Sequence, residues 1–176
     1  MANFENFANK LLELEGGYVN HPKDKGGPTK FGVILSVWRE HGHDKDGDGD
    51  IDAEDIKRLT ESDARYIAKR LFWDYFRADE IINESIAQLV VDWGYHSGRT
   101  TVARIVQRIL GVTVDGIVGS ETLKALNTLD QEKLFSSLKI ERKVFLNNII
   151  RRKPDQIVFY DGWMNRLNKF QFRKAA

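Results

Sequence analysis

Apolar residues recur at intervals of three and four positions along most of this chain, and this spacing constrains the fold more than any other feature. Within residues 4–15 the apolar side chains fall on one face of a helix. The same spacing continues in the stretches 33–38, 66–72, 86–93, 102–110, 130–152 and 163–172. We therefore expect a mainly α fold, with at most one small β-hairpin near the N-terminus.

Glycine, proline and capping residues set the expected limits of the first helices. Residues 16–28 hold four of the fourteen glycines and two of the three prolines, which indicates a loop or a short hairpin. A second helix is expected from Thr29 to Gly42. Thr60 followed by Asp63 is a variant of the capping box and predicts the start of another helix.

Composition excludes several classes of protein. A chain of 176 residues with 41 % apolar residues can bury the core of one domain, or of one domain with a small appendage. A formal net charge of +1 gives no broad basic surface for nucleic acid. The lack of cysteine excludes disulfides, thiolate metal sites and thiol catalysis. No apolar run approaches the ~20 residues that span a bilayer, so we expect no membrane insertion. We expect a monomer.

Two acids near the N-terminus have the arrangement that cleavage of a sugar–sugar bond requires. Glu15 ends the first helical stretch, where the helix dipole and burial in a cleft would help it to keep its proton. Asp24 lies between Lys23 and Lys25, which favour its ionised form. One carboxyl could then protonate the leaving oxygen while the other activates a water molecule held by Thr29. On residue types alone, it stays open that Glu15 is a surface residue and Asp24 a turn former.

The acidic segment from Asp44 to Asp55 fits the twelve-residue loop of an EF-hand. The expected calcium ligands stand at positions one, three, five, seven and twelve: Asp44, Asp46, Asp48, Asp50 (through its carbonyl) and Asp55. Gly49 at position six permits the sharp turn, and aspartate at position twelve is shorter than the usual glutamate. Because so many like charges repel each other, we expect a bound cation rather than a solvated loop. A lone loop favours a structural ion over a sensor.

Four separated segments, in order, resemble the motifs of glycoside hydrolase family 108, a family of N-acetylmuramidases that includes phage endolysins. The first segment runs Glu15-Gly16-Gly17-Tyr18-Val19-Asn20 and continues through Pro22, Asp24, Gly26-Gly27, Thr29 and Gly32-Val33. The others are Asp92–Gly98, Val114–Leu123 and Gly162–Arg166. His21 stands where relatives often carry aspartate, which leaves Asp24 as the acid of this loop.

The resemblance implies a lysozyme-like helical enzyme with a small early hairpin and the EF-hand-like loop. It would hydrolyse the β-1,4 bond between N-acetylmuramic acid and N-acetylglucosamine in bacterial peptidoglycan. Glu15 takes the role of general acid, Asp24 that of the base in an inverting reaction, and Thr29 holds the water. Substrate contacts are expected from four further residues: Tyr18, Asn20, Trp93 and Tyr95.

The resemblance also implies how the chain is organised and where it acts. Residues 1–98 would form the catalytic region with the calcium loop 44–55 inserted. Residues 99–176 would form a helical, peptidoglycan-binding-like region that packs with it as one globular unit. Since residues 1–10 lack the pattern of a signal peptide, the protein is expected in the cytoplasm, from which a holin or another export route would release it to the wall.

Two rival functions remain open at this point. A lytic transglycosylase also needs one acidic glutamate but no water-activating carboxylate, so Asp24 and Thr29 disfavour it. A non-catalytic peptidoglycan-binding or secretion-accessory protein would use the Val114–Leu123 element alone. The complete motif around Glu15 disfavours that alternative.

Overall fold

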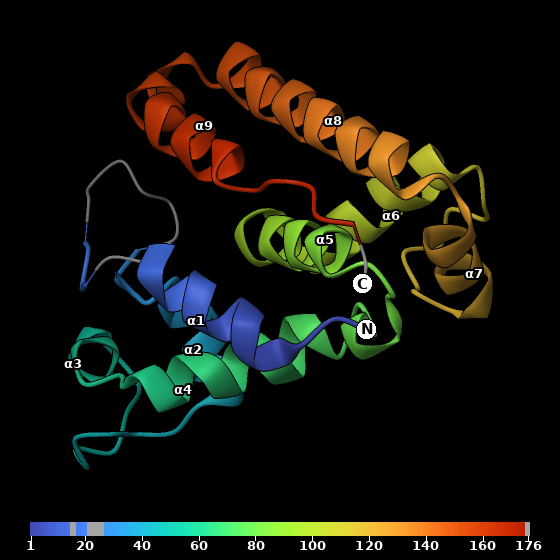
Figure 1. Cartoon of the computed structure of the whole chain (residues 1–176). Helices are drawn as coiled ribbons and strands as arrows, with labels where there is room; N and C mark the ends of the chain where they lie inside the picture. Colours follow the sequence, from blue (N-terminus) through green and yellow to red (C-terminus); the bar gives the residue numbers. More distant parts are fainter. Residues whose placement is uncertain (15–16, 21–26, 175–176) are drawn as a thin grey trace. The chain divides into compact units, whose positions relative to one another are not determined.

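A computed structural model describes residues 1–14, 17–20 and 27–174 (Figure 1). The chain divides into two compact units: Glu5–Leu71, here called the N-terminal unit, and Met1–Phe4 with Phe72–Ala176, here called the C-terminal unit. Among the described residues, regular structure is helical apart from one two-stranded antiparallel hairpin, which confirms the expected mainly α fold. None of the described helices is both long enough and apolar enough to cross a bilayer.

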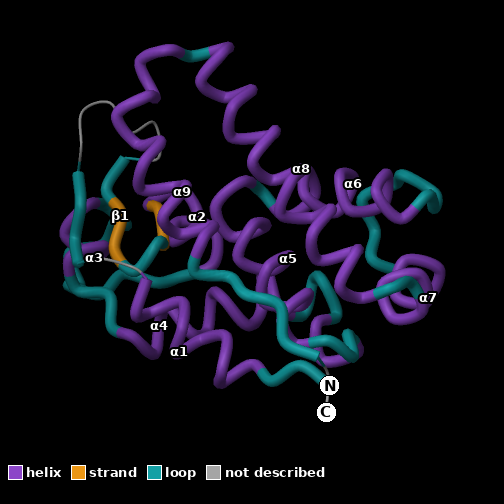
Figure 2. Tube along the Cα trace, turned by 45° about the horizontal axis from the view of Figure 1, so that its top comes forward, coloured by secondary structure: helices purple, strands orange, loops and turns teal. Residues whose placement is uncertain are grey.

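The helices of the N-terminal unit pack around a small apolar core. They are α1 (Phe4–Leu14), α2 (Leu35–His41), α3 (Ala53–Lys57) and α4 (Glu61–Ile67), and α4 continues into the π-helix η1 (Ala68–Trp73). Helices α1 and α4 lie side by side (Figures 1 and 2), and Arg65 of α4 donates a hydrogen bond to Glu5 of α1 over 2.9 Å. Phe7, Leu11 and Ile67 are buried, as the helical spacing predicted.

A β-hairpin occupies the first part of the segment 29–42 where a helix was expected, so the expected start at Thr29 was wrong. The expected end was right, because α2 (Leu35–His41) ends immediately before Gly42. Strand β1 (Thr29–Lys30) pairs antiparallel with β2 (Val33–Ile34), and Figure 2 shows the strands in orange. Phe31 and Gly32 both have positive φ angles, 51° and 76°, which suit the two-residue turn of a right-twisted hairpin. The β-branched side chains of β2 favour a strand, and helix α2 begins only after them.

Other helix ends confirm the sequence analysis. Thr60 and Asp63 form the capping box of α4, in which the side chain of each residue accepts a hydrogen bond from the backbone N–H of the other. Gly111, with φ at 70°, follows the last turn of its helix. The Asp130 side chain accepts the N–H of Lys133 over 3.0 Å at the start of α8. These helix ends could be predicted from the sequence because their contacts join residues at most four positions apart.

Helix α5 is the most deeply buried element of the C-terminal unit. The helices of this unit are η2 (Ala78–Glu80), α5 (Glu84–Ser97), α6 (Arg99–Leu110), α7 (Ser120–Thr128), α8 (Gln131–Arg152), η3 (Pro154–Phe159) and α9 (Tyr160–Asn168). Helix α5 packs on α6 and α8, and α8 packs on α9 (Figure 1). Nine of the 14 residues of α5 are buried, more than one face of a helix supplies, so it is covered on several sides.

The last helix departs from its expected range. Apolar spacing predicted a helix over 163–172, whereas α9 spans Tyr160–Asn168. Beyond α9 the chain is not helical, yet Phe170 is only 2 % exposed, and its carbonyl accepts a hydrogen bond from Lys139 Nζ over 2.8 Å. The guanidinium of Arg142, also on α8, lies 5.8 Å from the centroid of the Phe170 ring. Phe170 is therefore buried beside a distant helix, and the helical spacing of its side chain is incidental.

Asp92, within α5, is a buried carboxylate held by arginines from two other helices. The residue is 1 % exposed. Arg142 of α8 donates from Nη2 to Asp92 Oδ2 over 2.8 Å. Arg166 of α9 donates from Nε to Oδ1 and Oδ2 at 3.0 and 3.2 Å, and from Nη2 to Oδ1 at 2.5 Å. One side chain thereby joins three helices.

The arginines keep Asp92 ionised despite its burial. Burial by itself raises the pKa of Asp92, but the positive charges of Arg142 and Arg166 outweigh it and hold the pKa well below its usual range. A carboxylate whose pKa is lowered by folding stabilises the fold at pH values above its unfolded pKa, which is about 4. This contribution is lost as the pH falls from there toward the folded pKa.

We predict that Asp92→Asn lowers the free energy of unfolding at pH 7 by about 3–5 kcal/mol, because both arginines lose their buried counter-charge. Urea denaturation measures the loss, and the difference from the wild type should shrink below about pH 4, where the wild-type carboxylate also loses its advantage. The control is Glu80→Gln in the exposed Arg77–Glu80 pair, which should leave the free energy of unfolding almost unchanged because solvent screens that pair. Equal losses for the two variants would contradict a special role of Asp92.

Two helical glycines of the C-terminal unit have opposite surroundings. A Cβ atom on Gly94 of α5 would lie 2.4 Å from Cε2 of Phe76, a ring that is 1 % exposed. The same atom on Gly162 of α9 would meet nothing within 4 Å. Gly94 therefore allows the close approach of a buried ring, whereas Gly162 leaves space for a side chain.

We predict that Gly94→Ala destabilises the protein by about 1–3 kcal/mol through overpacking against Phe76. Gly162→Ala, the matched control, should stabilise it by about 0.5–1 kcal/mol, because alanine has the higher helix propensity and the site is open. Urea denaturation followed by circular dichroism measures both changes. If the Gly94→Ala variant were as stable as Gly162→Ala, the ring of Phe76 would have to move aside without loss of stability.

Candidate functional site

Of the three residues expected to act on the sugar bond, one lies in the described part of the chain. Glu15 and Asp24 lie outside the described residues. Helix α1 is described as far as Leu14, immediately before Glu15. Thr29 is described and begins strand β1.

Thr29 is held by two backbone pairings at once. It faces Ile34 across the hairpin, and it exchanges two N–H to carbonyl hydrogen bonds with Val19, at 2.8 and 2.9 Å. Its hydroxyl donates to the carbonyl of Gly27 over 2.9 Å. Because the hydroxyl proton is used in this bond, the oxygen lone pairs are the groups that it can offer to a water molecule or a sugar hydroxyl.

The two expected substrate contacts beside Val19 differ in their surroundings. Tyr18 is half-buried, and Nζ of Lys57 lies 5.6 Å from the centroid of its ring, a cation–π distance. Asn20 is exposed. The amide of Asn20 is therefore open to solvent, whereas the ring of Tyr18 already has a partner within the N-terminal unit.

Trp93 and Tyr95, the expected substrate contacts of α5, do not share one environment. Trp93 is fully buried and packs edge to face on Phe145, with ring centroids 5.8 Å apart. A ring without exposed surface cannot stack on a sugar, so the expectation for Trp93 is corrected to a role in the core. Tyr95 is half-buried and packs on Phe72 at 4.8 Å between centroids. A substrate contact by Tyr95 stays a prediction.

The acidic segment Asp44–Asp55 lies between α2 and α3 and forms a helix–loop–helix unit with them. Gly47 and Gly49 have φ angles of 82° and 100°, in the left-handed region that glycine adopts without strain. Arg39 of α2 donates from Nε to the carbonyl of Ile51 over 2.8 Å, which fastens the second half of the loop to the preceding helix.

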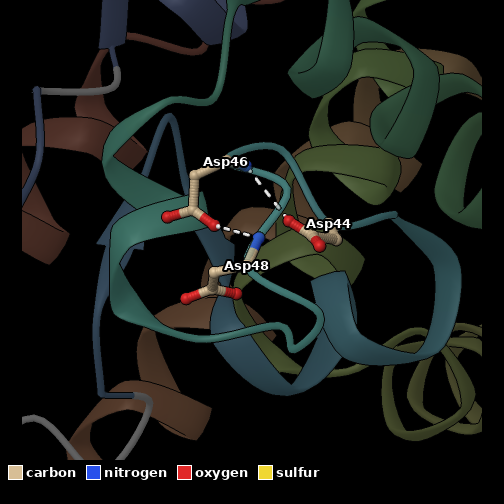
Figure 3. A group of neighbouring side chains, drawn as sticks. All are labelled: Asp44, Asp46 and Asp48. Carbon is tan, nitrogen blue, oxygen red and sulfur yellow. Dashed lines mark hydrogen bonds between the residues drawn. The ribbon is translucent and has the colours of Figure 1, made fainter.

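Asp44 organises the first half of the loop (Figure 3). Its Oδ1 accepts the N–H group of Asp46 at 3.1 Å. Oδ1 also accepts the N–H group of Gly47 at 2.6 Å, and Oδ2 accepts that of Gly49 at 2.8 Å. Asp46 Oδ1 accepts the N–H of Asp48 at 3.4 Å. One carboxylate oxygen each of Asp44, Asp46 and Asp48 then lies within 4.8 Å of the others. This spread fits oxygens that surround one calcium ion at about 2.3–2.6 Å.

Asp55 organises the second half of the loop. It is fully buried, and its two oxygens accept the N–H groups of Lys45 at 2.5 Å and Asp52 at 2.7 Å. Asp52 in turn caps α3 by accepting the N–H of Glu54 at 2.6 Å. Oxygens of Asp50, Asp52 and Asp55 also lie within 4.8 Å of one another. Both acidic groups could hold a metal ion, and Asp52 joins the second although it was not an expected ligand.

Hydrogen bonds and charge repulsion act in opposite directions in this loop. Backbone N–H groups lower the pKa of Asp44 and of Asp55. The negative charge of Asp48 raises the pKa of Asp50, and partial removal from water raises the pKa of Asp46. The loop thus stabilises two of its charges internally, and a bound cation would relieve the repulsion among the others.

Comparison with known proteins identifies the family of the chain. A family model described as Glycosyl hydrolase 108 matches residues 8–98, more than half of the 176 residues. The chain belongs to glycosyl hydrolase family 108. It is therefore a glycoside hydrolase, as the motif resemblance indicated. A second model, described as Predicted Peptidoglycan domain, matches residues 101–168 of this family 108 hydrolase.

A solved structure, that of Brucella abortus SagA, is similar to this family 108 hydrolase over nearly its whole length. The two chains are 26 % identical, with a TM-score of 0.78, and the match covers 95 % of this chain and 90 % of that chain. No curated protein matches the chain. The two family matches meet between residues 98 and 101, whereas the compact units divide between Leu71 and Phe72. The expected domain boundary after residue 98 stays a prediction.

Two of the four motifs of this family 108 hydrolase, the second and the fourth, meet in the C-terminal unit. Asp92 begins the second motif and Arg166 ends the fourth, and the two residues form an ion pair. In the third motif the N–H of Gly116 donates to Oε1 of Gln107 over 2.8 Å. Sequence reasoning missed Gln107 and Arg142. Both are polar residues on the buried face of a helix, and that position is the signal that could have found them.

Proposed function

We propose that this chain hydrolyses the β-1,4 bond between N-acetylmuramic acid and N-acetylglucosamine in bacterial peptidoglycan. The observation that carries the proposal is the pairing of two matches in one chain, the family 108 match over 8–98 and the peptidoglycan domain match over 101–168. The family 108 match indicates that a glycosidic bond is cleaved, and the peptidoglycan domain match indicates the polymer that contains this bond. The enzyme acts as an endolysin does, after a holin or another export route has released it to the wall.

The proposed roles follow the motif in the N-terminal unit. Glu15 is the general acid and Asp24 the base that activates water, so the reaction inverts the anomeric configuration. Thr29 holds the water, and its hydrogen bond to Gly27 supports this role because it turns the hydroxyl into an acceptor for a water proton. Asn20, which is exposed at the end of the described stretch 17–20, is a sugar contact.

The acidic loop, in this proposal, binds one structural calcium ion. Its ligands are the carboxylates of Asp44, Asp46, Asp48 and Asp55 and the carbonyl of Asp50. Support comes from the all-oxygen donor set and from the spacing of the first three carboxylates, whose oxygens lie within 4.8 Å. The ion would tie α2 to α3 and take no part in the cleavage.

We predict that Glu15→Gln abolishes the release of reducing ends from purified peptidoglycan, because the amide keeps the shape but cannot donate the catalytic proton. Asp24→Asn should slow the reaction by about 10²–10⁴-fold. Glu13→Gln is the matched control: Glu13 is exposed on α1, two residues before Glu15, and its loss should leave the rate unchanged. Circular dichroism checks that each variant is folded.

The products separate the rival reactions. NMR early in the reaction should show the α anomer of the product released from the β bond. Mass spectrometry should show reducing ends rather than anhydro ends. An anhydro product would establish a lytic transglycosylase, and a retained β product would exclude Asp24 as the base of an inverting reaction. Normal activity of a folded Glu15→Gln variant would contradict the role of Glu15 as the general acid.

We predict that excess calcium raises the melting temperature, relative to EDTA, by roughly 5–10 °C. A hundredfold excess over Kd stabilises by about 2.7 kcal/mol, and each kcal/mol shifts the melting temperature by about 2–4 °C for a chain of this size. Magnesium should substitute poorly, because it demands a tight octahedron. Asp44→Asn should remove the calcium shift, and Asp161→Asn, exposed on α9, should keep it. Identical calorimetric curves in calcium and EDTA would exclude the ion.

A further inference from the structure

Two apolar side chains are exposed and three aromatic ones are half-buried where η3 leads into α9, at the turn between α8 and α9 (Figure 1). We call this surface the aromatic face, and it consists of Ile157, Val158, Phe159, Tyr160 and Trp163. No residue of η3 is buried. Ile157 and Val158 are 55 % and 58 % exposed, and Phe159, Tyr160 and Trp163 are half-buried. Apolar surface gathered in one place marks an interaction site more often than scattered apolar residues do.

Two rings of the aromatic face are nearly parallel. The centroids of Phe159 and Trp163 lie 6.1 Å apart, and their planes meet at 28°. Residues four apart share one face of a helix, so the junction of η3 and α9 presents the two rings together. The other three tryptophans of the chain, Trp38, Trp73 and Trp93, are at most 2 % exposed. The fold thus keeps one tryptophan partly outside its core, beside a second ring.

Hydrogen-bonding and charged groups border the aromatic face. The hydroxyl of Tyr160 donates to Oδ1 of Asn147 on α8 over 2.8 Å, which fixes the ring and leaves the phenol oxygen as an acceptor. The basic run 151–153 is exposed at the end of α8. Asp155 and Asp161 are exposed nearby and carry the opposite charge. The border suits a polar ligand with both hydroxyl and carboxylate groups, and its mixed charge leaves the rings as the main source of affinity.

We infer that the aromatic face binds the glycan strand of peptidoglycan, with a sugar ring resting on Phe159 and Trp163. The inference rests on the proposed function, because its ligand is the polymer named there. Sugars in β-1,4 linkage present C–H groups on the faces of their rings, and these slightly positive hydrogens match the negative face of an aromatic ring. The peptidoglycan domain match over 101–168 covers the whole aromatic face. The basic run would meet carboxylates of the peptide stems.

A second copy of this chain is the other occupant that an apolar face could take. A stable protein interface buries about 800 Å² on each partner and involves roughly 20–30 residues a side. The aromatic face comprises five residues with charged groups at its border, which is small for such an interface and sufficient for one or two sugar rings. A glycan strand therefore fits it better, and self-association is an outcome that the test can detect.

The partly exposed ring of Trp163 allows a direct test. The probe is peptide-free glycan strands from purified peptidoglycan, added to the Glu15→Gln protein so that they are not cleaved. We expect the strands to protect tryptophan fluorescence from quenching by acrylamide, because the other tryptophans are already shielded. Phe159→Ala keeps the reporter and should weaken Kd by about tenfold, the effect of removing one aromatic anchor.

Two further variants separate binding from folding. Trp163→Phe keeps a ring in place, so co-sedimentation with the strands should persist while the protection of fluorescence disappears. Ile140→Ala on α8 is the matched control, because Ile140 is 65 % exposed but lies outside the aromatic face, and its Kd should not change. Circular dichroism confirms the fold of each variant.

The outcomes distinguish this inference from the proposed function. Unchanged binding by folded Phe159→Ala, or the same fluorescence protection in Trp163→Phe, would overturn the inference even if the wild-type protein hydrolyses the wall. Absence of hydrolysis by the wild-type protein, with binding that depends on Phe159, would refute the proposed function alone. Sedimentation of the free protein as a dimer that Ile157→Ser dissociates would assign the face to a second copy.

Discussion

The ion pairs of Asp92 with Arg142 and Arg166 are the interaction on which the arrangement of the C-terminal unit depends. Apolar packing of α5 against α6 and α8 is favourable but not directional, so by itself it does not select one register between helices. Arg166 contacts both oxygens of the carboxylate, and such a two-pronged pair fixes position and angle together. A buried charge is costly unless it is paired, which makes every other register of these helices unfavourable. The fixed α9 in turn carries Tyr160 and Trp163 of the aromatic face.

The N-terminal unit is organised by different means, mostly by contacts within short segments. The acidic loop shapes itself through the N–H groups that Asp44 and Asp55 accept, and the hairpin closes through a two-residue turn. A loop that is already shaped loses little conformational freedom when it takes up an ion, so less of the binding energy is spent on ordering it. The same reasoning applies to Thr29, which two backbone pairings hold in place before any substrate arrives.

The proposed cleavage in one region and the proposed polymer binding in another would suit an insoluble substrate. A glycan strand held on the aromatic face would make the next cleavage an encounter within one complex, at an effective concentration that free enzyme does not reach. Individual sugar contacts could then be weak, which would let the proposed hydrolase move along the wall between cuts. This division of labour joins the proposed hydrolase to the surface on α9 without requiring any further ligand.

The sequence by itself determined the features that depend on neighbours along the chain. The helical spacing, the capping box of Thr60 and Asp63 and the turn-forming glycines of the acidic loop all rest on residues a few positions apart, where propensity and local hydrogen bonds decide. The family motifs were readable for the same reason. A small early hairpin was expected, but its position at β1 and β2 was not, because the apolar residues there also fit a helical spacing.

Only the tertiary structure decided which residues meet across the chain. Asp92 lies 50 positions from Arg142 and 74 from Arg166, and no local pattern states that a carboxylate and two arginines will share one site. Nor does a sequence distinguish Trp93, which is buried, from Trp163, which is partly exposed. Both are large apolar residues on helices, and their burial depends on which distant helix packs above them. Such contacts form only after long loops of chain have closed, and that closure is a property of the whole fold.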